Sequence, residues 1–491
     1  MTAPKPGHTY FVPGMRIMRL RDKFQCGTAD PGRELKEIAY DVLKVEVTQT
    51  HTGPWHYCIT LNNWYDSLPA DRKQGFGALE RVPAGQDPTW PRYKYNDFQI
   101  LNFGMRLRID MRYFPKPDAD FDSLARQQHD WTPMIAGPIT DMKFTFHPEE
   151  GARLEVCGCD ELCALKGHDG DVDFWSVPVE DVIKKILDLA HFPCKEPCPS
   201  PSGAPRPPFL RSKNSKLAER LFATQTYLEY LQKLADRIDF EMFMEFTNVD
   251  DPGSGLCFYF EPARSKLPPG GRINPIRIER GVNLIRWTPF IDLDNQVTSV
   301  TITGRQGDLK NPAPQFAKVP ANDTCEEADM LLRNELPQRT APSAPGANDE
   351  DKERLLSGPC WYLRNRGEPN PDSQEATGQV PATFAQIEAE AAFRRKARQF
   401  LQVEVITIGL PRARAGQYIE IRGMRAPFDG FYYVEKAIHT YTYETERESG
   451  SPEEYGRERG SGEKHGFRTK LYCRRPGMPY PDPSGFGFIP R

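Results

Sequence analysis

The sequence contains no long apolar run, since none of its segments approaches the roughly 20 apolar residues that a membrane-spanning helix requires. The first residues, MTAPKPGHTYFVPGM, lack the apolar core of a secretory signal. We therefore expect a soluble chain made in the cytoplasm, with no membrane segment. Neither sign of charge dominates, because 64 Lys and Arg residues are balanced by 68 Asp and Glu residues, for a net charge of −4. This balance excludes the basic footprint of a nucleic-acid-binding protein.

Motifs of common enzyme classes are also missing. No P-loop, dinucleotide fingerprint, G-x-S-x-G or H-E-x-x-H pattern stands out. Acidic pairs such as Glu149-Glu150 and Asp160-Glu161 are too common to indicate a glycosidase, which needs two carboxylates about 5–10 Å apart in a cleft. His439 stands alone in a tyrosine-rich segment, where a packed, hydrogen-bonded role is favoured over that of a base. The sequence therefore predicts no enzyme and no cofactor.

The 491 residues are enough for three or four structural units at about 100–200 residues each. The 46 prolines and the 11% aromatic content suit strands and ordered loops better than helical bundles. Short segments with alternating apolar residues occur at 43–48, 57–64, 105–113, 134–147 and 152–160. Such a series, broken by turns, predicts an antiparallel sheet or barrel.

The middle of the chain has a different pattern. Apolar residues at helical spacing predict helices at 176–192 and 226–240, and Thr226 with Glu229 forms a capping box at the second. A hairpin is expected over 240–261. Strand patterns then return at 283–306, 403–411, 415–423, 429–444 and 465–475, with a helix at 383–401.

These patterns give a mainly β fold with an α+β insert. The predicted units are an N-terminal arm at 1–35, a first β-barrel at 36–168, an α+β domain at 169–270, a second β-barrel at 271–309 and 381–475, a Pro-rich polar insertion at 310–380 and a C-terminal tail at 476–491.

The order of the strand segments resembles a known family. The first series reads ITLNNWYD, FGMRLRIDMRYFP and WTPMIAGPITDMKFTFHPEEGARLEVCGCDEL, and the last reads GLPRARAGQYIEIRGMRAPFDGFYYVEKAIHTYT. This ordered set resembles the late control protein D family, the baseplate hub proteins of contractile phage tails. It is also similar to the N-terminal hub region of type VI secretion spike proteins. The resemblance covers roughly residues 40–306 and 383–475, and departs from the family pattern at Ala136, before Gly137.

The resemblance implies a fold and a role. Two tail-tube-like antiparallel β-barrels would flank the small α+β domain, and three chains would form a trimeric, pseudo-six-fold ring. The role would be that of a structural baseplate hub, which adapts the six-fold tail tube to the three-fold central spike and forms part of the channel. Expected partners are the homotrimer, the tail tube protein, the central spike protein, the baseplate wedge proteins and DNA that passes through the channel without sequence-specific binding. The expected location is the virion, in the tail baseplate, and the expected process is viral genome ejection.

Several residues match the family pattern and receive structural roles. Asp160 follows a strand, where its carboxylate is expected to cap the backbone N–H groups of the next segment. Glycines are expected at turns or bulges, namely Gly137, Gly416, Gly423 and Gly430, and Gly158 matches the family beside Asp160 as a structural residue.

The cysteines leave three interpretations open. The 11 cysteines are too few for a disulfide scaffold, and their odd number leaves at least one thiol outside any intrachain disulfide. Five are closely spaced, as C-x-C and C-x₃-C at Cys157, Cys159 and Cys163, and as C-x₃-C at Cys194 and Cys198. They are weak candidates for a zinc site, which needs four ligands, and could equally form disulfides or remain thiols. The best local pair is Cys194–Cys198, across a Pro-rich turn, and the fold itself requires no metal.

Alternative functions also remain open. The arginines of one predicted strand, Arg106, Arg108 and Arg112, are expected on a solvated or inter-subunit face, with a channel-lining role as the second interpretation. The alternative to a hub is a tail-associated cell-wall hydrolase, and a third interpretation is a zinc-dependent adhesion module.

Overall fold

The computed structural model describes most of the predicted β and α+β regions. The described residues are 11–63, 93–115, 131–147, 151–167, 171–199, 216–221, 224–248, 251, 253–262, 276–292, 294, 296–297, 299–305, 371–379, 382–425, 428–442 and 466–477. Residues 310–370 of the predicted insertion and 478–491 of the predicted tail lie outside them.

The first half of the chain forms an N-terminal β unit. Its strands are β1 (Phe11–Arg19), β2 (Arg33–Glu34), β3 (Val42–Thr50), β4 (His56–Asn62), β5 (Arg106–Pro115), β6 (Thr132–His147) and β7 (Gly151–Cys159). Short 3-10 helices lie at η1 (Lys36–Ile38) and η5 (Glu161–Lys166). Part of the predicted N-terminal arm is a strand, because β1 pairs antiparallel with β5 from Phe11 to Arg19.

The last part of the chain forms a C-terminal β unit. Its strands are β12 (Ile276–Glu279), β13 (Leu284–Ile291), β16 (Leu401–Ile408), β17 (Tyr418–Arg422), β18 (Gly430–Thr442) and β19 (Gly466–Arg475). Alternation predicts these strands well: along β16, buried residues alternate with half-buried ones at every position, which is the period of a strand with one face on a core.

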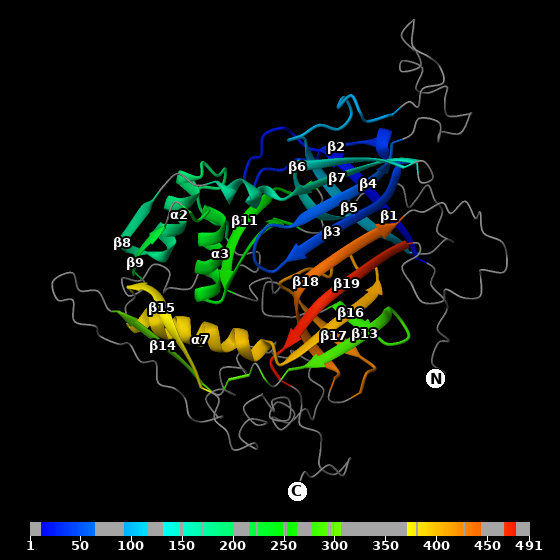
Figure 1. Cartoon of the computed structure of the whole chain (residues 1–491). Helices are drawn as coiled ribbons and strands as arrows, with labels where there is room; N and C mark the ends of the chain where they lie inside the picture. Colours follow the sequence, from blue (N-terminus) through cyan, green and yellow to red (C-terminus); the bar gives the residue numbers. More distant parts are fainter. Residues whose placement is uncertain are drawn as a thin grey trace, which may run out of the picture.

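The two β units share one 13-stranded sheet (Figure 1). Its order is β13-β16-β19-β18-β3-β4-β7-β6-β5-β1-β2, with β17 beside β18 and β12 beside β17. The units meet where residues 44–50 of β3 pair antiparallel with residues 436–442 of β18, and we call this contact the β3–β18 junction. The predicted mainly β class is confirmed, and the two predicted barrels are continuous through this junction.

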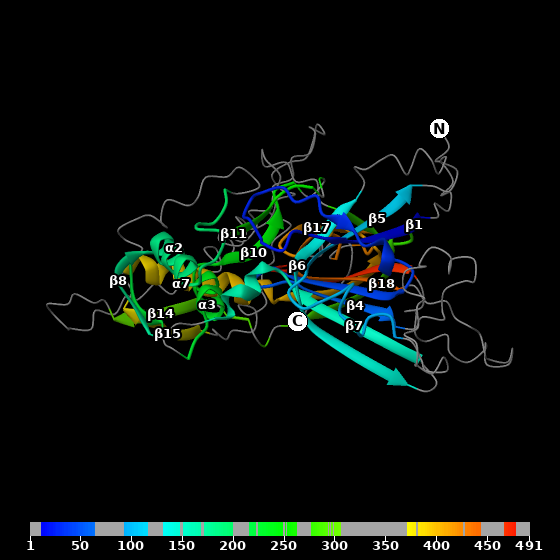
Figure 2. The ribbon, with the colours of Figure 1, turned by 90° about the horizontal axis from the view of Figure 1, so that it is seen from above.

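A middle unit lies beside the sheet and contains the α-helices of the described residues (Figures 1 and 2). It comprises β8 (Val172–Pro178), α2 (Val179–Leu189), β9 (Lys216–Leu221), α3 (Tyr227–Arg237), β10 (Phe240–Phe246), β11 (Leu256–Pro262), β14 (Ser299–Arg305), β15 (Pro371–Gln379) and α7 (Ala382–Arg398). The predicted capping box of α3 is confirmed, since Glu229 N–H donates to Thr226 Oγ1 and Thr226 N–H donates to Glu229 Oε2. The first predicted helix begins later than expected, because residues 172–178 form β8.

The boundary between the middle and C-terminal units also differs from the predicted one. Helix α7 was expected in the second barrel, but Ala389, Ala392 and Phe393 belong to the same apolar core as α2 and α3. Strand β14 pairs with β15 in a four-stranded sheet that also contains β9 and β8. The chain therefore returns to the middle unit before it completes the C-terminal β unit.

Candidate functional site

Arg106 and Arg108 of β5 lie inside the molecule. Their side chains are 6% and 2% exposed. Arg106 Nε donates to Glu161 at 2.6 Å, and Arg108 Nε donates to Asp110 at 2.9 Å. The backbone carbonyls of Asp30 and Pro31 accept further hydrogen bonds from Arg108, so the segment after β1 covers this face. The prediction of a solvated, inter-subunit or channel-lining face is therefore wrong for both residues.

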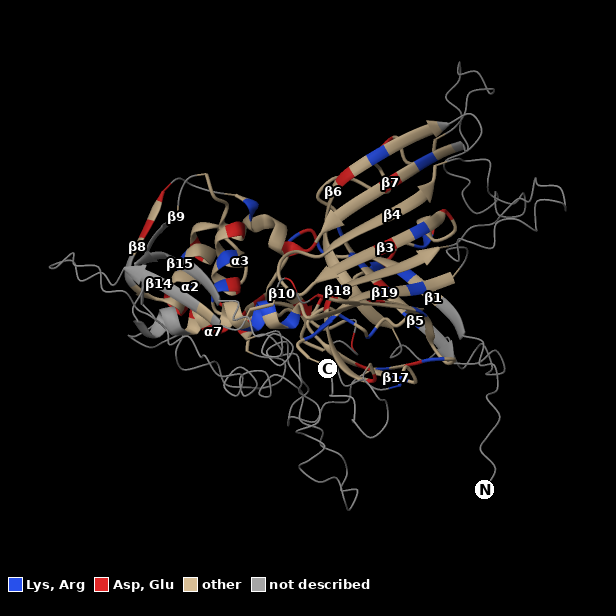
Figure 3. Cartoon of the chain, turned by 60° about the horizontal axis from the view of Figure 1, so that its bottom comes forward, with Lys and Arg blue, Asp and Glu red and all other residues tan. Residues whose placement is uncertain are grey.

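The third arginine of that strand, Arg112, is half-buried. Its guanidinium lies over the ring of Trp131, 4.0 Å from the centroid, and that of Arg16 lies 4.6 Å from the same centroid. Elsewhere, charges of both signs are interspersed along the described strands (Figure 3).

The β3–β18 junction contains a buried histidine. His439 of β18 pairs with Val47 of β3, and its Nδ1 lies 3.1 Å from Thr469 Oγ1 on β19. Burial, reinforced by the positive charge of Arg414, lowers the pKa of His439 to about 3. The imidazole is therefore neutral at physiological pH, as expected of a packed residue.

Arg414 connects all three units. It lies in the loop between β16 and β17, and 1% of its side chain is exposed. Its Nη1 donates to Glu245 Oε1 of β10 at 2.5 Å, and its Nη2 donates to the backbone carbonyl of Pro133 in β6. One side chain thus joins the C-terminal β unit to the middle unit and to the N-terminal β unit.

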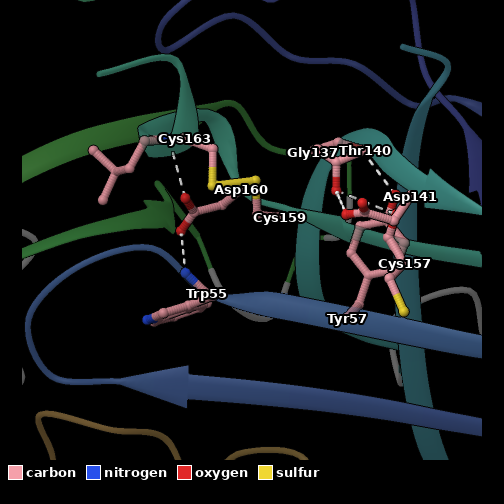
Figure 4. Close-up of a disulfide and its surroundings, with 10 residues drawn as sticks. Trp55, Tyr57, Gly137, Thr140, Asp141, Cys157, Cys159, Asp160 and Cys163 are labelled. Atoms are coloured by element: carbon pink, nitrogen blue, oxygen red, sulfur yellow. Dashed lines mark hydrogen bonds between the residues drawn. A yellow bond between two sulfur atoms is a disulfide. The ribbon is translucent and has the colours of Figure 1, made fainter. Parts of the chain in front are cut away.

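Asp160 caps the corner where β7 turns into η5 (Figure 4). Its Oδ1 accepts from Leu162 N–H at 3.0 Å, and its Oδ2 accepts from Trp55 N–H at 2.9 Å. The predicted capping role is confirmed. Burial raises the pKa of Asp160 to about 8, and the two backbone donors act against this shift.

Two of the predicted glycines, Gly137 (Figure 4) and Gly158, allow close backbone approaches near this corner. A Cβ atom on Gly137 would lie 1.9 Å from the carbonyl oxygen of Cys159. A Cβ atom on Gly158 would lie 2.3 Å from the carbonyl oxygen of Pro138 and 2.4 Å from the Tyr57 ring. Neither position can hold a larger residue without a backbone shift. The other three, Gly416, Gly423 and Gly430, have positive φ.

The cysteines of the C-x-C segment form disulfides. Cys159 is bonded to Cys163, as Figure 4 shows. Cys157 is bonded to Cys58 of β4. The predicted Cys194–Cys198 pair is not formed, since Cys194 is bonded to Cys26, which tertiary structure brings close from 168 positions away. Cys26, Cys58 and Cys257 were missed because nothing in their local sequence marks them.

One edge of the shared sheet is apolar and exposed. Strand β13 ends the sheet order and pairs with β16 along one side. Three of its large apolar side chains are strongly exposed, namely Ile285 at 48%, Phe290 at 60% and Ile291 at 42%. Val282, just before the strand, is 71% exposed. These exposed apolar residues make the β13 edge a candidate surface for protein contact.

A second edge lies on β6. Residues 132–138 pair with β5, whereas residues 139–147 pair with β7. Among the described strands, only β7 borders this second half of β6. The β6–β7 ribbon projects from the sheet (Figure 2), and Phe146 near its tip is 50% exposed.

Comparisons with known proteins give structural similarity only. No protein-family profile matches the sequence, and no curated protein sequence matches it. The fold is similar to a tail protein from Neisseria meningitidis MC58, with 10% identity, 94% of this chain and 96% of that chain covered, and a TM-score of 0.49. It is also similar to the 43 kDa tail protein of prophage MuSo2 from Shewanella oneidensis. The identity is 10%, 95% of this chain and 100% of that chain are covered, and the TM-score is 0.46.

A third similarity is to the Escherichia coli c3393 protein, a component of the type VI secretion system. The identity is 9%, 92% of this chain and 76% of that chain are covered, and the TM-score is 0.42. The first two of these solved structures are thus tail proteins, and the third is a component of a type VI secretion system. In the residues that the structure describes, no helix is long and apolar enough to cross a membrane.

Proposed function

We propose that this chain is the structural baseplate hub of a contractile tail, which adapts a six-fold tail tube to a three-fold central spike. The observation that carries the proposal is the β3–β18 junction, which places two β units side by side in one continuous sheet. Three such chains supply six β units around one axis. A ring of this kind can match a six-fold tube on one face and a three-fold spike on the other.

The exposed edges provide the contacts that such a ring needs. A strand edge with unpaired backbone groups is a template for pairing with another chain, and burial of apolar side chains stabilises the contact. The β13 edge lies at one end of the sheet, and the β6 edge lies on the ribbon at the other β unit. We propose that these edges meet neighbouring subunits, so that the described sheet continues around the ring.

The internal contacts fit a rigid adaptor. Arg414 joins the three units, and hydrogen bonds from the buried guanidinium groups of Arg106 and Arg108 hold the segment after β1 against β5. A hub that transmits force between tube and spike needs such fixed relative positions. The channel would be lined by the sheets of the ring, and DNA would pass through it. The tail tube protein, the spike protein and the wedge proteins would be the partners, and the virion baseplate the location.

The test is the assembly state of the full chain. Native mass spectrometry and cryo-electron microscopy are expected to show three copies with six β units around a channel, alone or with the tail tube protein. Phe290→Lys with Ile285→Lys should weaken the trimer. Thr288→Lys is the matched control, since it adds a charge to the same exposed strand without removing an apolar side chain.

Monomers under all conditions, including added tube protein, would refute the hub. The hydrolase alternative predicts clearing of a peptidoglycan zymogram, whereas the hub predicts none.

A further inference from the structure

Four cysteine sulfurs gather between the segment after β1, the loop after α2, and β11. Cys26 comes from the first, Cys194 and Cys198 come from the second, and Cys257 comes from the third. The Sγ atoms of Cys26, Cys198 and Cys257 all lie within 4.8 Å of one another. Cys194 is bonded to Cys26. The cluster is largely protected from solvent, because Cys194 and Cys257 are 1% and 5% exposed.

The spacing of the sulfurs suits a tetrahedral metal ion. A zinc–thiolate bond of about 2.3 Å places any two ligand sulfurs of a tetrahedron about 3.8 Å apart. Cys26 Sγ and Cys198 Sγ lie 3.7 Å apart. With Cys257 Sγ within 4.8 Å of both, these three sulfurs can occupy one face of a tetrahedron. The C-x₃-C spacing of Cys194 and Cys198 is one that zinc sites use.

Backbone contacts hold the three segments in place around the sulfurs. Gly27 N–H donates to Leu256 O at 2.8 Å, and Cys198 N–H donates to Phe258 O at 2.7 Å. A Cβ atom on Gly255 would lie 2.3 Å from the carbonyl carbon of Gly27, so these two segments approach as closely as glycine allows. The ligands are therefore positioned by the fold and not only by the disulfide.

The other sulfur groups of the described residues are less complete. Cys58 and Cys157 have Glu155 as a third ligand, and Cys159 and Cys163 have His56. Each of these groups offers three ligands and contains a disulfide. Only the group around Cys26 offers four sulfurs within the part of the chain that the structure describes.

We propose that the reduced chain binds one structural Zn²⁺ through Cys26, Cys194, Cys198 and Cys257. A dithiol reductant, of the kind present in a cytoplasm, converts the Cys26–Cys194 disulfide to two thiols and is itself oxidised to a disulfide. The four thiols then lose four protons as they bind one Zn²⁺, which gives a complex of net charge −2. The ion fastens the segment after β1 to the middle unit, where the disulfide does so in the oxidised chain. This site goes beyond the proposed hub function and does not depend on it.

Metal analysis of the full chain, purified with a dithiol reductant and without chelator, tests the site. We expect about one zinc per chain, and under a tenth of that for Cys257→Ser and for Cys198→Ser. Cys473→Ser is the matched control, because it removes a buried thiol of β19 outside the cluster and should leave the zinc content unchanged.

Cobalt substitution keeps the test informative if the serine variants fold poorly. Co²⁺ in the wild-type chain should show the intense visible bands of a tetrahedral thiolate site. Cys198→His, which retains four ligands, should keep one metal per chain and shift those bands. The proposal is overturned if the reduced wild-type chain holds no zinc, if Cys473→Ser loses as much metal as Cys257→Ser, or if Cys198→His leaves the cobalt spectrum unchanged.

Discussion

Replacement of Arg414 by methionine tests how firmly the three units are held together. The change keeps most of the side-chain volume but leaves Glu245, which is 5% exposed, without its cation. Loss of one partner of a buried ion pair generally costs about 3–5 kcal/mol of stability. Glu245 Oε1 keeps the hydrogen bond from Phe246 N–H, so the penalty should lie in the lower part of that range.

Protonation sets an upper limit on this penalty. A glutamate in an unfolded chain ionises near pH 4.3, so keeping the carboxyl protonated in the folded state at pH 7 costs about 1.36 × 2.7, or about 3.7 kcal/mol. At pH 5.5 the same limit is about 1.6 kcal/mol. We therefore expect Arg414→Met to lose about 3–4 kcal/mol at pH 7, and roughly half of that loss at pH 5.5.

The matched control is the double variant Arg414→Met with Glu245→Leu. It loses the same donor to Pro133 and the same charge beside His439 but leaves no unpaired carboxylate at position 245. It should regain most of the stability, because replacing a whole buried ion pair with apolar residues is often neutral. Thermal unfolding followed by circular dichroism should show the single variant about 3–4 °C below the double at pH 7, because an unfolding entropy of about 2.1 cal/mol/K for each of 491 residues gives about 1 °C per kcal/mol. Single and double variants that unfold within about 1 kcal/mol of each other at pH 7 would refute this reasoning.

Three further predictions concern the buried corner and the β3–β18 junction. Since the pKa of His439 is lowered to about 3, against about 6.5 in an unfolded chain, its contribution to stability is complete above pH 6.5. This contribution is lost as the pH falls toward 3, and the loss amounts to about 2.7 kcal/mol at pH 4.5. Urea unfolding of His439→Gln should lack this loss. If the stability of the variant fell with pH as steeply as that of the wild type, His439 would not be its source. The raised pKa of Asp160, about 8, has the opposite sign: stability falls as the pH rises from about 4 to 8. Asp160→Asn should remove this fall in stability between about pH 4 and 8. It should also cost about 1–3 kcal/mol, because the amide nitrogen of Asn faces a backbone N–H donor. If the fall in stability is unchanged in the variant, Asp160 is not its source. Gly137→Ala should lower the free energy of unfolding by at least about 1–3 kcal/mol, whereas Gly167→Ala, with open space at its Cβ position, should change it little; equal melting temperatures for the two would contradict the close approach.

Local sequence patterns predicted which segments form strands and helices more accurately than they predicted which side chains are buried. The alternation in β3 and β16 follows from the two-residue period of a strand, and the capping box of α3 follows from hydrogen bonds within four residues. The same alternation led to a wrong prediction at β5. There the arginines lie on the strand face opposite the apolar residues, a pattern that is typical of a solvent-exposed face. The structure covers that face with the segment after β1, from about 78 to 85 positions away in sequence.

The sequence by itself therefore determined the mainly β class and the local role of Asp160 as a cap. These depend on periodicity and on contacts between close neighbours, which any short segment displays. Only the tertiary structure decided that β3 joins β18, that Arg414 reaches Glu245 and Pro133, and that Cys26 and Cys257 approach Cys194 and Cys198. Each of these contacts links residues far apart in the chain, and their proximity depends on how whole units pack, for which a single sequence has no local signal.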